Sequence, residues 1–474
     1  MQLKPLVVDL DGTLLRSDLL VESGLAYLKS NIFQVFSPLI WLRSGKAYLK
    51  ERLAERTSLD VTVLPYNQKV IAFIEGEREK GREIILATAS HAIYAEKVAE
   101  YLQLFDHVYA TCGGTNLSAH RKRDRLVELF GEKGFDYMGN SKDDLYIWEA
   151  ADCAHVVNPE VGVESKAKAL GNVGEVITDT DSQFRLWIKQ LRLHQWVKNL
   201  LLFVPVLASH QVGDIDLVLN GVIAFIFFGL CASSVYVLND LLDLEDDRHH
   251  VKKRNRPFAS GALSIKSGLL AAPAVLAVSF IGAFLLLPWE FTFVLAIYYV
   301  LTVAYSMCLK RKVMVDVITL AMLYTIRIIA GAFALSIALT FWMLTFSMFI
   351  FLSLAFVKRY AELMDARLEG KQEMTRGRGY YPSDLEMISS LGASSGYISV
   401  MVLALYIQEI TTVALYSNPQ VIWLACPVLL FWVSRVWFLT HRGEMHDDPI
   451  VFAIKDRVSL FTGGLFGVIF WLAA

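Results

Sequence analysis

Long apolar segments dominate the C-terminal part of the chain. A transmembrane helix needs about 20 residues, and a segment in lipid must pair its own backbone polar groups, which favours helices. Hydrophobic residues make up 55% of the chain and the mean hydropathy is +0.43, as in polytopic membrane proteins. We predict an all-α polytopic bundle of about nine transmembrane helices, over residues 195–211, 216–238, 267–287, 289–307, 314–336, 339–356, 396–415, 419–439 and 457–473.

Basic residues are distributed unevenly over the loops that connect these segments. Loops after the even-numbered segments contain Lys and Arg, whereas loops after the odd-numbered segments (SHQVGDID, LPWE, SIALT and SNPQ) contain none. The positive-inside rule places the basic loops in the cytosol. The N-terminus has no signal-peptide pattern, which agrees with this orientation. We predict a multi-pass protein of the inner (cytoplasmic) membrane, with a cytosolic N-terminal domain and the C-terminus outside.

The N-terminal residues have a different pattern, because short β-type runs alternate with polar, helix-like segments. The runs are PLVVDL, EIILATAS, HVYAT, FDYMGN and AHVVNP. Such alternation is typical of βαβ units around a parallel sheet. We predict a multidomain chain: an α/β Rossmann-like domain over 1–175, a linker over 176–186 and the membrane domain over 187–474. The stretch VGEVITDTDSQF (173–184) has the polar composition of a linker.

The first predicted strand ends in Asp9-Leu10-Asp11-Gly12-Thr13. This places both carboxylates at the C-terminal edge of a sheet, where α/β proteins build sites. One aspartate can attack phosphorus while its neighbour transfers the proton, and Mg²⁺ would neutralise the phosphate between them. At later positions Thr88 can donate a hydrogen bond to a phosphate oxygen, and Lys122 can balance the phosphoryl charge. The alternative is a strand that ends in a solvated turn.

In this order the segments resemble the haloacid dehalogenase superfamily of phosphatases, over roughly residues 5–155. The resemblance implies Asp9 as the nucleophile and Asp11 as the general acid/base, both also close to the metal. It implies that Thr88 and Lys122 hold the phosphate, and that Asp144 is a third carboxylate on the magnesium side.

The family usually has an aspartate where this chain has Asn140. A non-catalytic regulatory or docking module therefore remains an alternative for the N-terminal domain. The resemblance also implies a substrate-selecting cap over about 20–60. Within it, IFQVFSPLIWL (32–42) is either a buried cap helix or a helix that lies on the membrane surface.

The second apolar segment is followed by NDLLDLEDDRHHVKKRNRPFASG (239–261). If its helix continues past Tyr236, then Asp240, Asp243 and Asp247 fall within about 60° on one helix face. Clustered carboxylates repel one another unless a cation lies among them, and Mg²⁺ takes carboxylate and phosphate oxygens. The alternative is a solvated acidic helix end. We call Asp240, Asp243 and Asp247 the aspartate stripe, and Asn239 lies beside it. Three basic residues that can donate hydrogen bonds to a diphosphate follow in the sequence: Lys253, Arg254 and Arg256.

The pattern NDxxDxxxD followed by KRxRPxxSG resembles the UbiA superfamily of intramembrane prenyltransferases, which have nine helices, over residues 185–474. Typical members ionise an allylic diphosphate and pass the prenyl group to an aromatic acceptor. The segments LRxxQWxKN, RYAEL and DPxxxxxxD together are similar to one branch, the decaprenyl-phosphate phosphoribosyltransferases. That resemblance implies phosphoribosyl diphosphate as one substrate and a polyprenyl phosphate lipid as the other.

The membrane half contains further polar residues that we expect to bind substrate. Arg327 lies about ten residues into its span, where an uncompensated charge is costly, so it is expected to face a cavity. The usual second DxxxD motif is absent, and the polar loop 357–394 suits a hydrophilic sugar phosphate, although a solvated connector is the alternative for most of its charges. The predicted residues are Lys198, Asn199, Lys310, Asp316, Arg327, Arg359 and Glu362.

These observations favour a Mg-dependent enzyme with two steps. The membrane domain would transfer 5-phosphoribosyl to a polyprenyl phosphate, and the tethered phosphatase would remove the 5-phosphate. The alternative is a prenyltransferase that moves an isoprenoid from its diphosphate to an aromatic or other acceptor. A net charge of −2 gives no bulk attraction to nucleic acid. The sequence leaves the oligomeric state open, and a homo-oligomer is one of the alternatives.

Overall fold

The computed structural model contains two compact units, which are described one at a time: Met1–Leu191 with Tyr236–Pro273, and Arg192–Val235 with Ala274–Ala474. The structure describes residues 3–30, 34, 36–112, 116–179, 182–368, 370, 378–409, 416–445 and 448–473.

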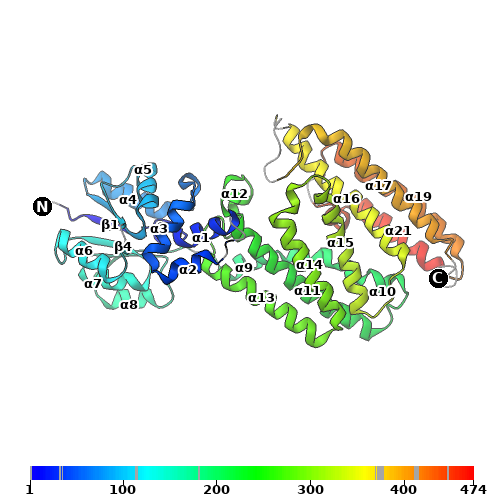
Figure 1. The fold of residues 1–474 in the computed structure, drawn as a ribbon, viewed down its shortest axis with the longest axis horizontal. Helices are drawn as coiled ribbons and strands as arrows, with labels where there is room; N and C mark the ends of the chain where they lie inside the picture. The colour runs from blue at the N-terminus through cyan, green and yellow to red at the C-terminus, as the bar shows by residue number, and fades with distance from the viewer. Residues whose placement is uncertain are drawn as a thin grey trace. The chain divides into compact units, whose positions relative to one another are not determined.

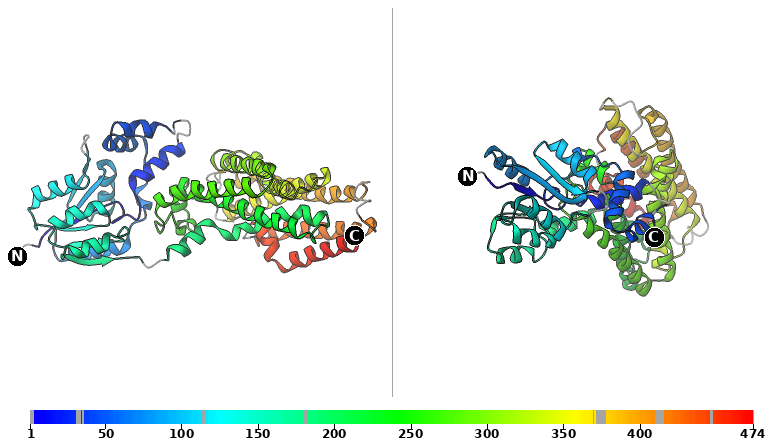
Figure 2. Two further views of the ribbon diagram at one scale, coloured as in Figure 1. Left: turned by 90° about the horizontal axis from the view of Figure 1, so that it is seen from below. Right: turned by 60° about the vertical axis from the view of Figure 1, so that its left-hand side comes forward.

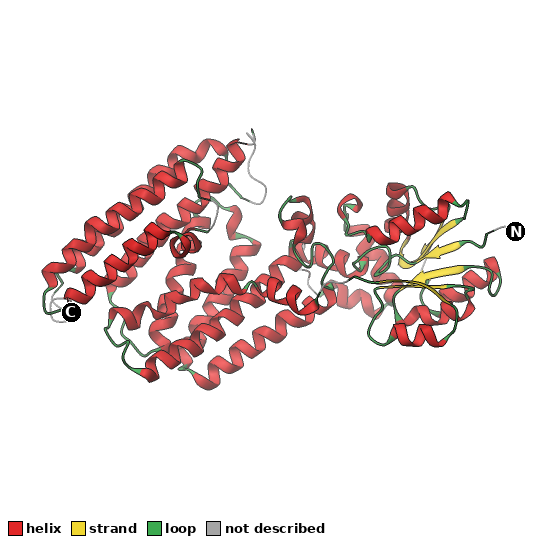
Figure 3. Cartoon of the chain, turned by 180° about the vertical axis from the view of Figure 1, so that it is seen from behind, coloured by secondary structure: helices red, strands yellow, loops and turns green. Residues whose placement is uncertain are grey.

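An all-parallel six-stranded sheet forms the centre of the first unit, with helices on both faces (Figures 1 and 3). The strand order is β3-β2-β1-β4-β5-β6. The first five strands coincide with the five predicted apolar runs and confirm the α/β class. The strands are β1 (Leu6–Val8), β2 (Ile84–His91), β3 (His107–Thr111), β4 (Asp136–Gly139), β5 (Ala154–Val157) and β6 (Val173–Ile177).

Alternating side chains of β1 face the two helical layers, because successive strand residues point to opposite sides. Leu6 and Val8 pack toward α4 (Gln68–Glu79) and α5 (Ala92–Leu102). Val7 packs on the other face, whose helices are α6 (His120–Phe130), α7 (Leu145–Ala150) and α8 (Val163–Ala169). The chain reverses its winding direction between β1 and β4, and α/β proteins bind ligands at the carboxyl ends of strands at such a switch point.

The predicted linker is a strand in its first part. Residues Val173–Ile177 form β6 at the edge of the sheet, and α9 covers Gln183–Leu191. The prediction of a linker from residue 176, within a polar stretch that begins at residue 173, was therefore wrong at its start. The β-branched residues Val173, Val176 and Ile177 pair with β5, and an edge strand tolerates polar neighbours on its exposed side.

The predicted cap is helical, with α1 (Leu19–Ser30), α2 (Ser37–Arg43) and α3 (Lys46–Arg56). None of the residues of α2 is buried. Phe36, Leu39 and Ile40 are 72%, 60% and 60% exposed. The interpretation of this segment as a buried cap helix is therefore wrong for the described residues, whereas a position on a membrane surface stays a prediction.

Long apolar helices make up the membrane half, and those of the second unit run side by side (Figure 2). Within the described residues, seven helices are long and apolar enough to cross a membrane, or eight if the pair Pro449–Lys455 and Arg457–Ala473, bent by 82°, is one span. The helices are α11 (Ile215–Leu242), α13 (Ile265–Leu286), α14 (Trp289–Met307), α15 (Val315–Ala334), α16 (Phe341–Leu368), α17 (Leu385–Tyr406), α19 (Ala425–His441), α20 (Pro449–Lys455) and α21 (Arg457–Ala473).

The first predicted span, 195–211, is not one long helix. A 3₁₀ helix covers Leu193–Phe203 and is followed by the short helix α10 (Val204–Ala208). Lys198 and Asn199 are buried within this segment, and Pro205 lies at the start of α10. Because the buried Lys198 and Asn199 are polar, the segment has no continuous apolar face. Pro205 cannot donate a backbone hydrogen bond, so it does not continue a helix that begins before it. The end of another predicted span, 410–415, lies outside the described residues.

Candidate active sites

Asp9 follows β1 and is paired with a buried lysine. The Nζ atom of Lys122, on α6, lies 2.7 Å from Oδ1 of Asp9 and 2.9 Å from the hydroxyl oxygen of Tyr137. Asp9 and Lys122 are both less than a tenth exposed. Burial raises the pKa of Asp9 to about 7, although the charge of Lys122 acts in the opposite direction. The predicted nucleophile and the predicted phosphate-holding lysine are thus in direct contact.

Asp11 lies in the turn after β1 and lines the same cleft. Its Oδ1 atom accepts a hydrogen bond from the N–H of Leu19 (2.8 Å), and Oδ2 accepts one from the hydroxyl of Ser90 (2.5 Å). Burial, together with the charge of Asp18, raises the pKa of Asp11 to about 6. Thr88 is fully buried, and its hydroxyl oxygen accepts a hydrogen bond from the N–H of Ser90. A carboxyl group with a pKa near neutrality suits proton transfer.

Asp144 is held by donors of the loop after β4. Its Oδ2 atom accepts hydrogen bonds from the N–H of Asn140 (3.0 Å) and from the N–H and hydroxyl of Ser141 (2.8 and 2.9 Å). Its Oδ1 atom accepts one from the hydroxyl of Tyr137 (2.9 Å). Gly139 permits this packing, because a Cβ atom there would lie 2.7 Å from Cγ of Asp144. These contacts fix the loop that carries Asn140, and a direct role of Asp144 in binding magnesium stays a prediction.

Asp9, Asp11, Ser90, Lys122 and Asp144 line a cleft of about 1030 Å³, whereas the fully buried Thr88 lies outside its lining. The cap contributes Lys50 of α3, whose Nζ atom donates to the carbonyl of Ala89 (2.6 Å) and to Oδ1 of Asn116 (2.8 Å). Arg16 and Lys142 line the same cleft. Basic groups around a pair of carboxylates are what a phosphorylated substrate requires, because the phosphate needs cationic donors while an aspartate attacks it.

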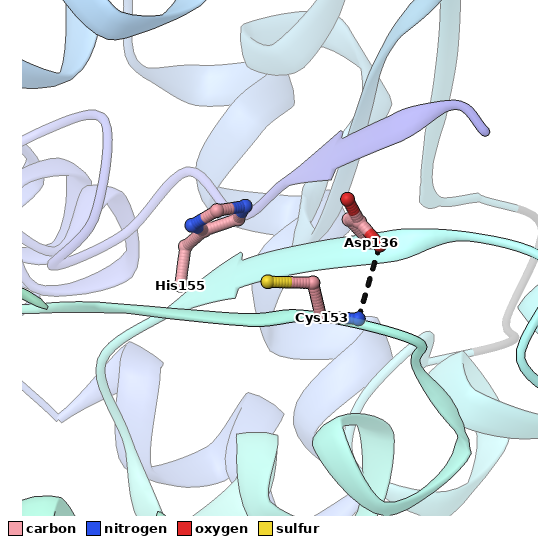
Figure 4. Close-up of side chains that lie close together, drawn as sticks. All are labelled: Asp136, Cys153 and His155. Carbon is pink, nitrogen blue, oxygen red and sulfur yellow. Dashed lines mark hydrogen bonds between the residues drawn. The ribbon is translucent and has the colours of Figure 1, made fainter. Parts of the chain in front are cut away.

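Another group of metal-ligating side chains lies at the opposite end of strands β4 and β5 (Figure 4). Ligand atoms of Asp136, Cys153 and His155 lie within 4.8 Å of one another. However, Asp136 is ion-paired with Arg82 and accepts a hydrogen bond from the N–H of Cys153 (3.0 Å). This group holds a single carboxylate, which the guanidinium of Arg82 and the N–H of Cys153 already occupy. We therefore assign this group to the packing of the sheet edge.

The aspartate stripe lies at the end of α11 that the sequence places in the cytosol. This helix continues past Tyr236, but only to Leu242, so the three aspartates do not lie on the one continuous helix that the sequence analysis assumed. Asp243 interrupts the helix before α12 (Leu244–His249). The Nη1 atom of Arg256 lies 3.0 Å from Oδ1 of Asp240 and 2.5 Å from Oδ2 of Asp247. Both aspartates are only 3% exposed. One guanidinium group therefore balances two carboxylates that the sequence assigned to magnesium.

The third aspartate of the stripe is paired with the cap. The Nζ atom of Lys29, at the end of α1, lies 2.9 Å from Oδ1 of Asp243 and 2.7 Å from Oδ2 of Asp246. In the first turn of α1, Glu22 accepts two hydrogen bonds from the guanidinium of Arg248, at 2.7 and 2.8 Å, and both side chains are buried. Beside these ion pairs is an apolar cluster, formed by Leu25, Val237, Leu241, Leu244, Phe258, Leu263, Ile265 and Ala272.

The remaining predicted residues of this stretch are Asn239, Lys253 and Arg254. The carbonyl of Asn239 accepts a hydrogen bond from the N–H of Asp243 (2.9 Å). Lys253 and Arg254 lie exposed on the short turn Lys253–Asn255. Gln190 of α9, which was not predicted, donates a hydrogen bond from Nε2 to Oδ2 of Asp240 (2.8 Å). The structure thus brings Arg256 to the carboxylates and leaves its two predicted basic partners at the surface.

The second unit contains an ion-pair network around Asp316, which is fully buried at the start of α15. The Nε atom of Arg359 lies 2.8 Å from its Oδ2 atom, and Nη1 of Arg378 lies 3.2 Å from Oδ1. The hydroxyl of Tyr305 donates a hydrogen bond to the same Oδ1 atom (2.7 Å). Arg359 also pairs with Glu362. The three predicted residues Asp316, Arg359 and Glu362 therefore belong to one network, whereas Lys310 lies on the preceding turn Leu309–Arg311.

Lys198 and Asp448 form another buried pair in the second unit, with Nζ and Oδ2 2.8 Å apart. Lys358 lies 3.3 Å from the same Oδ2 atom, and the hydroxyl of Tyr324 donates to the Asp448 carboxylate. Two lysines that share one carboxylate leave a net positive charge, which favours an anionic ligand.

Arg327 is nearly fully buried, as its position within a span predicted. Its Nε atom donates to Oδ1 of Asn199 (3.3 Å) and Nη2 donates to the hydroxyl of Tyr298 (3.1 Å). Its guanidinium also lies over the rings of Phe228, Tyr298 and Tyr324, at 5.3, 5.0 and 5.7 Å from their centroids. Burial among aromatic rings and hydrogen-bond acceptors compensates the charge. A cavity-facing role for Arg327 stays a prediction.

Comparisons with known proteins place the chain in a family. The sequence model of the UbiA prenyltransferase family matches residues 200–467. More than half of the chain is covered, and the chain belongs to this family. Its apolar helices and this membership make it a multi-pass membrane protein.

Three relatives narrow the comparison. The chain is 39% identical to uncharacterized protein y4nM of Sinorhizobium fredii, over 99% of this chain and 91% of that one. It is 37% identical to nodulation protein NoeC of Azorhizobium caulinodans, over 58% and 89% of the two chains. It is 31% identical to decaprenyl-phosphate phosphoribosyltransferase of Mycolicibacterium smegmatis, over 57% and 86%. The similarity to y4nM extends over both halves of the chain.

Sequence reasoning missed several residues of these sites. Ser90 follows Thr88 by two positions and could have been found from the strand end that both share. The contacts of Lys50, Lys29 and Arg378 join segments that are far apart in sequence: 39, 214 and 62 residues separate them from Ala89, Asp243 and Asp316. No local motif marks such contacts.

Proposed function

We propose that the membrane domain transfers 5-phosphoribosyl from phosphoribosyl diphosphate to a polyprenyl phosphate, and that the N-terminal domain hydrolyses the 5-phosphate of the product. The observation that carries the proposal is the meeting of Asp240 and Asp247 on Arg256 at the end of an apolar helix, in a chain of the UbiA prenyltransferase family. Similarity to decaprenyl-phosphate phosphoribosyltransferase supports ribose as the transferred group.

The stripe fits a magnesium ion, because Asp240, Asp243 and Asp247 offer hard carboxylate oxygens. When bound there, Mg²⁺ would supply charge neutralisation for a diphosphate leaving group. Arg256 would then exchange its carboxylate partners for the diphosphate, for which its fork of donors is suited. Lys253 and Arg254 of the adjacent turn would bind the same group.

The transfer forms one bond and breaks one bond. A phosphate oxygen of the polyprenyl phosphate bonds to the anomeric carbon of ribose, while the bond from that carbon to the diphosphate oxygen breaks, and diphosphate leaves. Lys198, Asn199, Lys310, Arg327 and Arg359 are proposed to hold the anionic groups of the two substrates. Asp316 and Glu362 would orient the guanidinium of Arg359, with which both pair.

The phosphatase step uses the cleft of the α/β domain. The Asp9 carboxylate attacks phosphorus, the bond from phosphorus to the ribose 5-oxygen breaks, and Asp11 donates a proton to that oxygen. Water then hydrolyses the acyl phosphate and Asp11 takes up its proton, which releases inorganic phosphate. Lys122, Thr88 and Ser90 are proposed to position the phosphoryl group. Asp9 and Asp11, with Asp144 nearby, fit Mg²⁺ through their carboxylate oxygens, and the ion would neutralise the phosphate.

The two steps share one compartment in this proposal. The basic loops favour a cytosolic position for the α/β domain and the aspartate stripe, in the inner membrane of a bacterial cell. The ribose product of the first step would then be formed on the side where the phosphatase lies. The tether raises the effective concentration of the second activity.

Two specific observations keep other functions in consideration. The family model is that of prenyltransferases, which favours isoprenoid transfer from its diphosphate to an aromatic or other acceptor. Asn140 and the buried contact between Glu22 and Arg248 favour a regulatory or docking role for the N-terminal domain.

The experiment is a competition between donors. Membranes that contain the full chain are given polyprenyl phosphate and a small aromatic acid, with labelled phosphoribosyl diphosphate in one arm and labelled prenyl diphosphate in the other. We expect a labelled lipid that contains ribose in the first arm. A labelled aromatic product in the second arm, without a ribose lipid in the first, would establish the prenyltransferase function instead.

A further inference from the structure

The phosphatase cleft is not lined by the α/β fold alone. Residues 261–267, from the segment that joins the aspartate stripe to α13, form one of its walls together with Asp11 and Arg16. This segment and the α/β domain belong to the same compact unit. The same segment leads directly into Ile265–Leu286, one of the helices that are long and apolar enough to cross a membrane.

The wall comes close to the loop that follows Asp11 at Gly261. Gly261 has a φ of +72°, and a Cβ atom at this position would lie 2.5 Å from Cβ and 2.7 Å from the carbonyl oxygen of Arg16. A side chain would therefore clash with backbone that cannot move aside easily, and it would be strained at this φ. The close approach of the wall to the loop after Asp11 thus depends on a residue without a side chain.

Lys266 brings a positive charge from this wall to the cleft. Its Nζ atom lies 2.8 Å from Oδ2 of Asp18. The next residue after Asp18 is Leu19, whose N–H donates to Asp11 at 2.8 Å. Lys266 is therefore connected to Asp11, the proposed general acid, through Asp18 and the backbone of Leu19. The lysine side chain is 65% exposed, so its ammonium group is accessible to a ligand in the cleft.

We propose that residues 261–267 form a subsite that binds a second phosphate of the phosphatase substrate, with Lys266 as the specificity-determining residue. The substrate class is a sugar phosphomonoester whose second phosphate is the diester linking the sugar to a membrane lipid. This inference rests on the proposed function. Lys266 would exchange Asp18 for the diester, and the backbone N–H groups at the start of the 22-residue helix α13 would favour the same negative charge.

The position of residues 261–267 favours a second phosphate that belongs to a membrane lipid over one that belongs to a free, soluble molecule. The segment that supplies Lys266 continues into an apolar helix, so a ligand held by it lies beside a span rather than at a distant surface. Free phosphoribosyl diphosphate also has a 5-phosphate and further phosphates, and it shares the same recognition chemistry. The two sources have to be separated by experiment.

The test compares four substrates of the full chain in detergent-lipid bilayers: lipid-linked ribose 5-phosphate, phosphoribosyl diphosphate, ribose 5-phosphate and p-nitrophenyl phosphate. We expect Lys266→Gln to raise KM about tenfold for the lipid-linked substrate with little change in kcat. For ribose 5-phosphate and p-nitrophenyl phosphate, which have no second phosphate, we expect changes within about twofold. Lys266→Arg should restore most of the affinity, because it keeps the charge.

A matched control is Lys97→Gln, since Lys97 is an exposed lysine of α5. Equal effects of Lys266→Gln on all four substrates, or no effect on the lipid-linked one, would overturn the subsite. Phosphoribosyl diphosphate as the preferred substrate, with a Lys266-dependent KM, would overturn the lipid source. If the wild-type chain hydrolyses none of the four, the phosphatase function itself fails, an outcome that is distinct from the loss of the subsite.

Discussion

Two aspartate clusters occur in the first compact unit, and they differ in how their charge is balanced. At Asp9 the cation is Lys122, which is buried and belongs to the same α/β fold. At the stripe the cations come from two directions: Arg256 from the following loop, and Lys29 from the cap helix α1. The Asp9 site is built around one fixed lysine, whereas the stripe is held by partners on separate segments.

The difference indicates how each cluster would handle its ligand. Strand ends and backbone donors fix Asp11 and Asp144, so the proposed phosphatase site would be preorganised for one phosphoryl group. The pairing of Asp243 with Lys29 is partly exposed, at 27% and 30%, and such pairs contribute little to stability. A metal ion can therefore replace Lys29 at modest cost.

Asp9→Asn should abolish hydrolysis of small phosphomonoesters, by about 1000-fold or more, because the nucleophile is lost. The amide keeps the shape of the side chain, and phosphoribosyl transfer should stay close to the wild-type rate. Phosphate release and lipid labelling are measured on the same membrane preparation. Equal loss of both activities would mean that the two clusters are not separate sites.

Asp243→Asn should lower phosphoribosyl transfer about 100-fold, because one of the proposed magnesium ligands becomes neutral. Asp246→Asn is the matched control, since Asp246 shares the same Lys29 partner but lies outside the predicted stripe and is 68% exposed. The assay is incorporation of labelled ribose into lipid, with the amount of protein in the membrane measured alongside. A similar loss in both variants would point to the ion pair with Lys29 rather than to a metal site.

Acidification should weaken magnesium activation of the phosphatase. Burial raises the pKa of Asp9 to about 7 and that of Asp11 to about 6, so protons occupy these carboxylates as the pH falls below those values. The half-saturating Mg²⁺ concentration should rise about tenfold per pH unit for each carboxylate that becomes protonated. It is measured by titrating Mg²⁺ into p-nitrophenyl phosphate assays between about pH 8 and about pH 5.5. A constant value over this range would contradict metal binding by these two residues.

Lys29→Met should lower the half-saturating Mg²⁺ concentration for transfer by about threefold, because a competing cation is removed from Asp243. The expected effect is small since the pair is partly exposed. Lys166→Met, at an exposed position of α8, serves as the control. A higher Mg²⁺ requirement in Lys29→Met would show that the lysine supports the site instead of competing with the metal.

The parts of the fold that were predictable are those that depend on local pattern. Five strands followed from apolar runs that alternate with polar segments. The single helix assumed for Asp240, Asp243 and Asp247 ends at Leu242 instead. Strand β6 was missed because a polar edge strand has the composition of a linker. The segment 195–211 was predicted as one span from its apolar content, although Lys198 and Asn199 are buried within it and Pro205 lies at the start of α10.

The candidate sites, like the fold, could be predicted only where they depend on local sequence pattern. The residues Asp9, Asp11 and Lys122 meet as predicted, since strand ends of a parallel sheet converge at one edge. The pairing of Lys29 with Asp243 and the contact of Gly261 with Arg16 depend on how the cap and the segment after α12 pack together. Such packing has no periodic signal in the sequence, so only the structure could reveal it.

The central claim is that the two clusters act in sequence on one lipid-linked ribose. The most direct measurement is the phosphate content of the lipid product made from labelled phosphoribosyl diphosphate and polyprenyl phosphate, compared between the wild type and Asp9→Asn. We predict a lipid-linked ribose without its 5-phosphate for the wild type, and the 5-phosphorylated lipid for Asp9→Asn. Identical lipid products from both, or no ribose-containing lipid from either, would contradict the account.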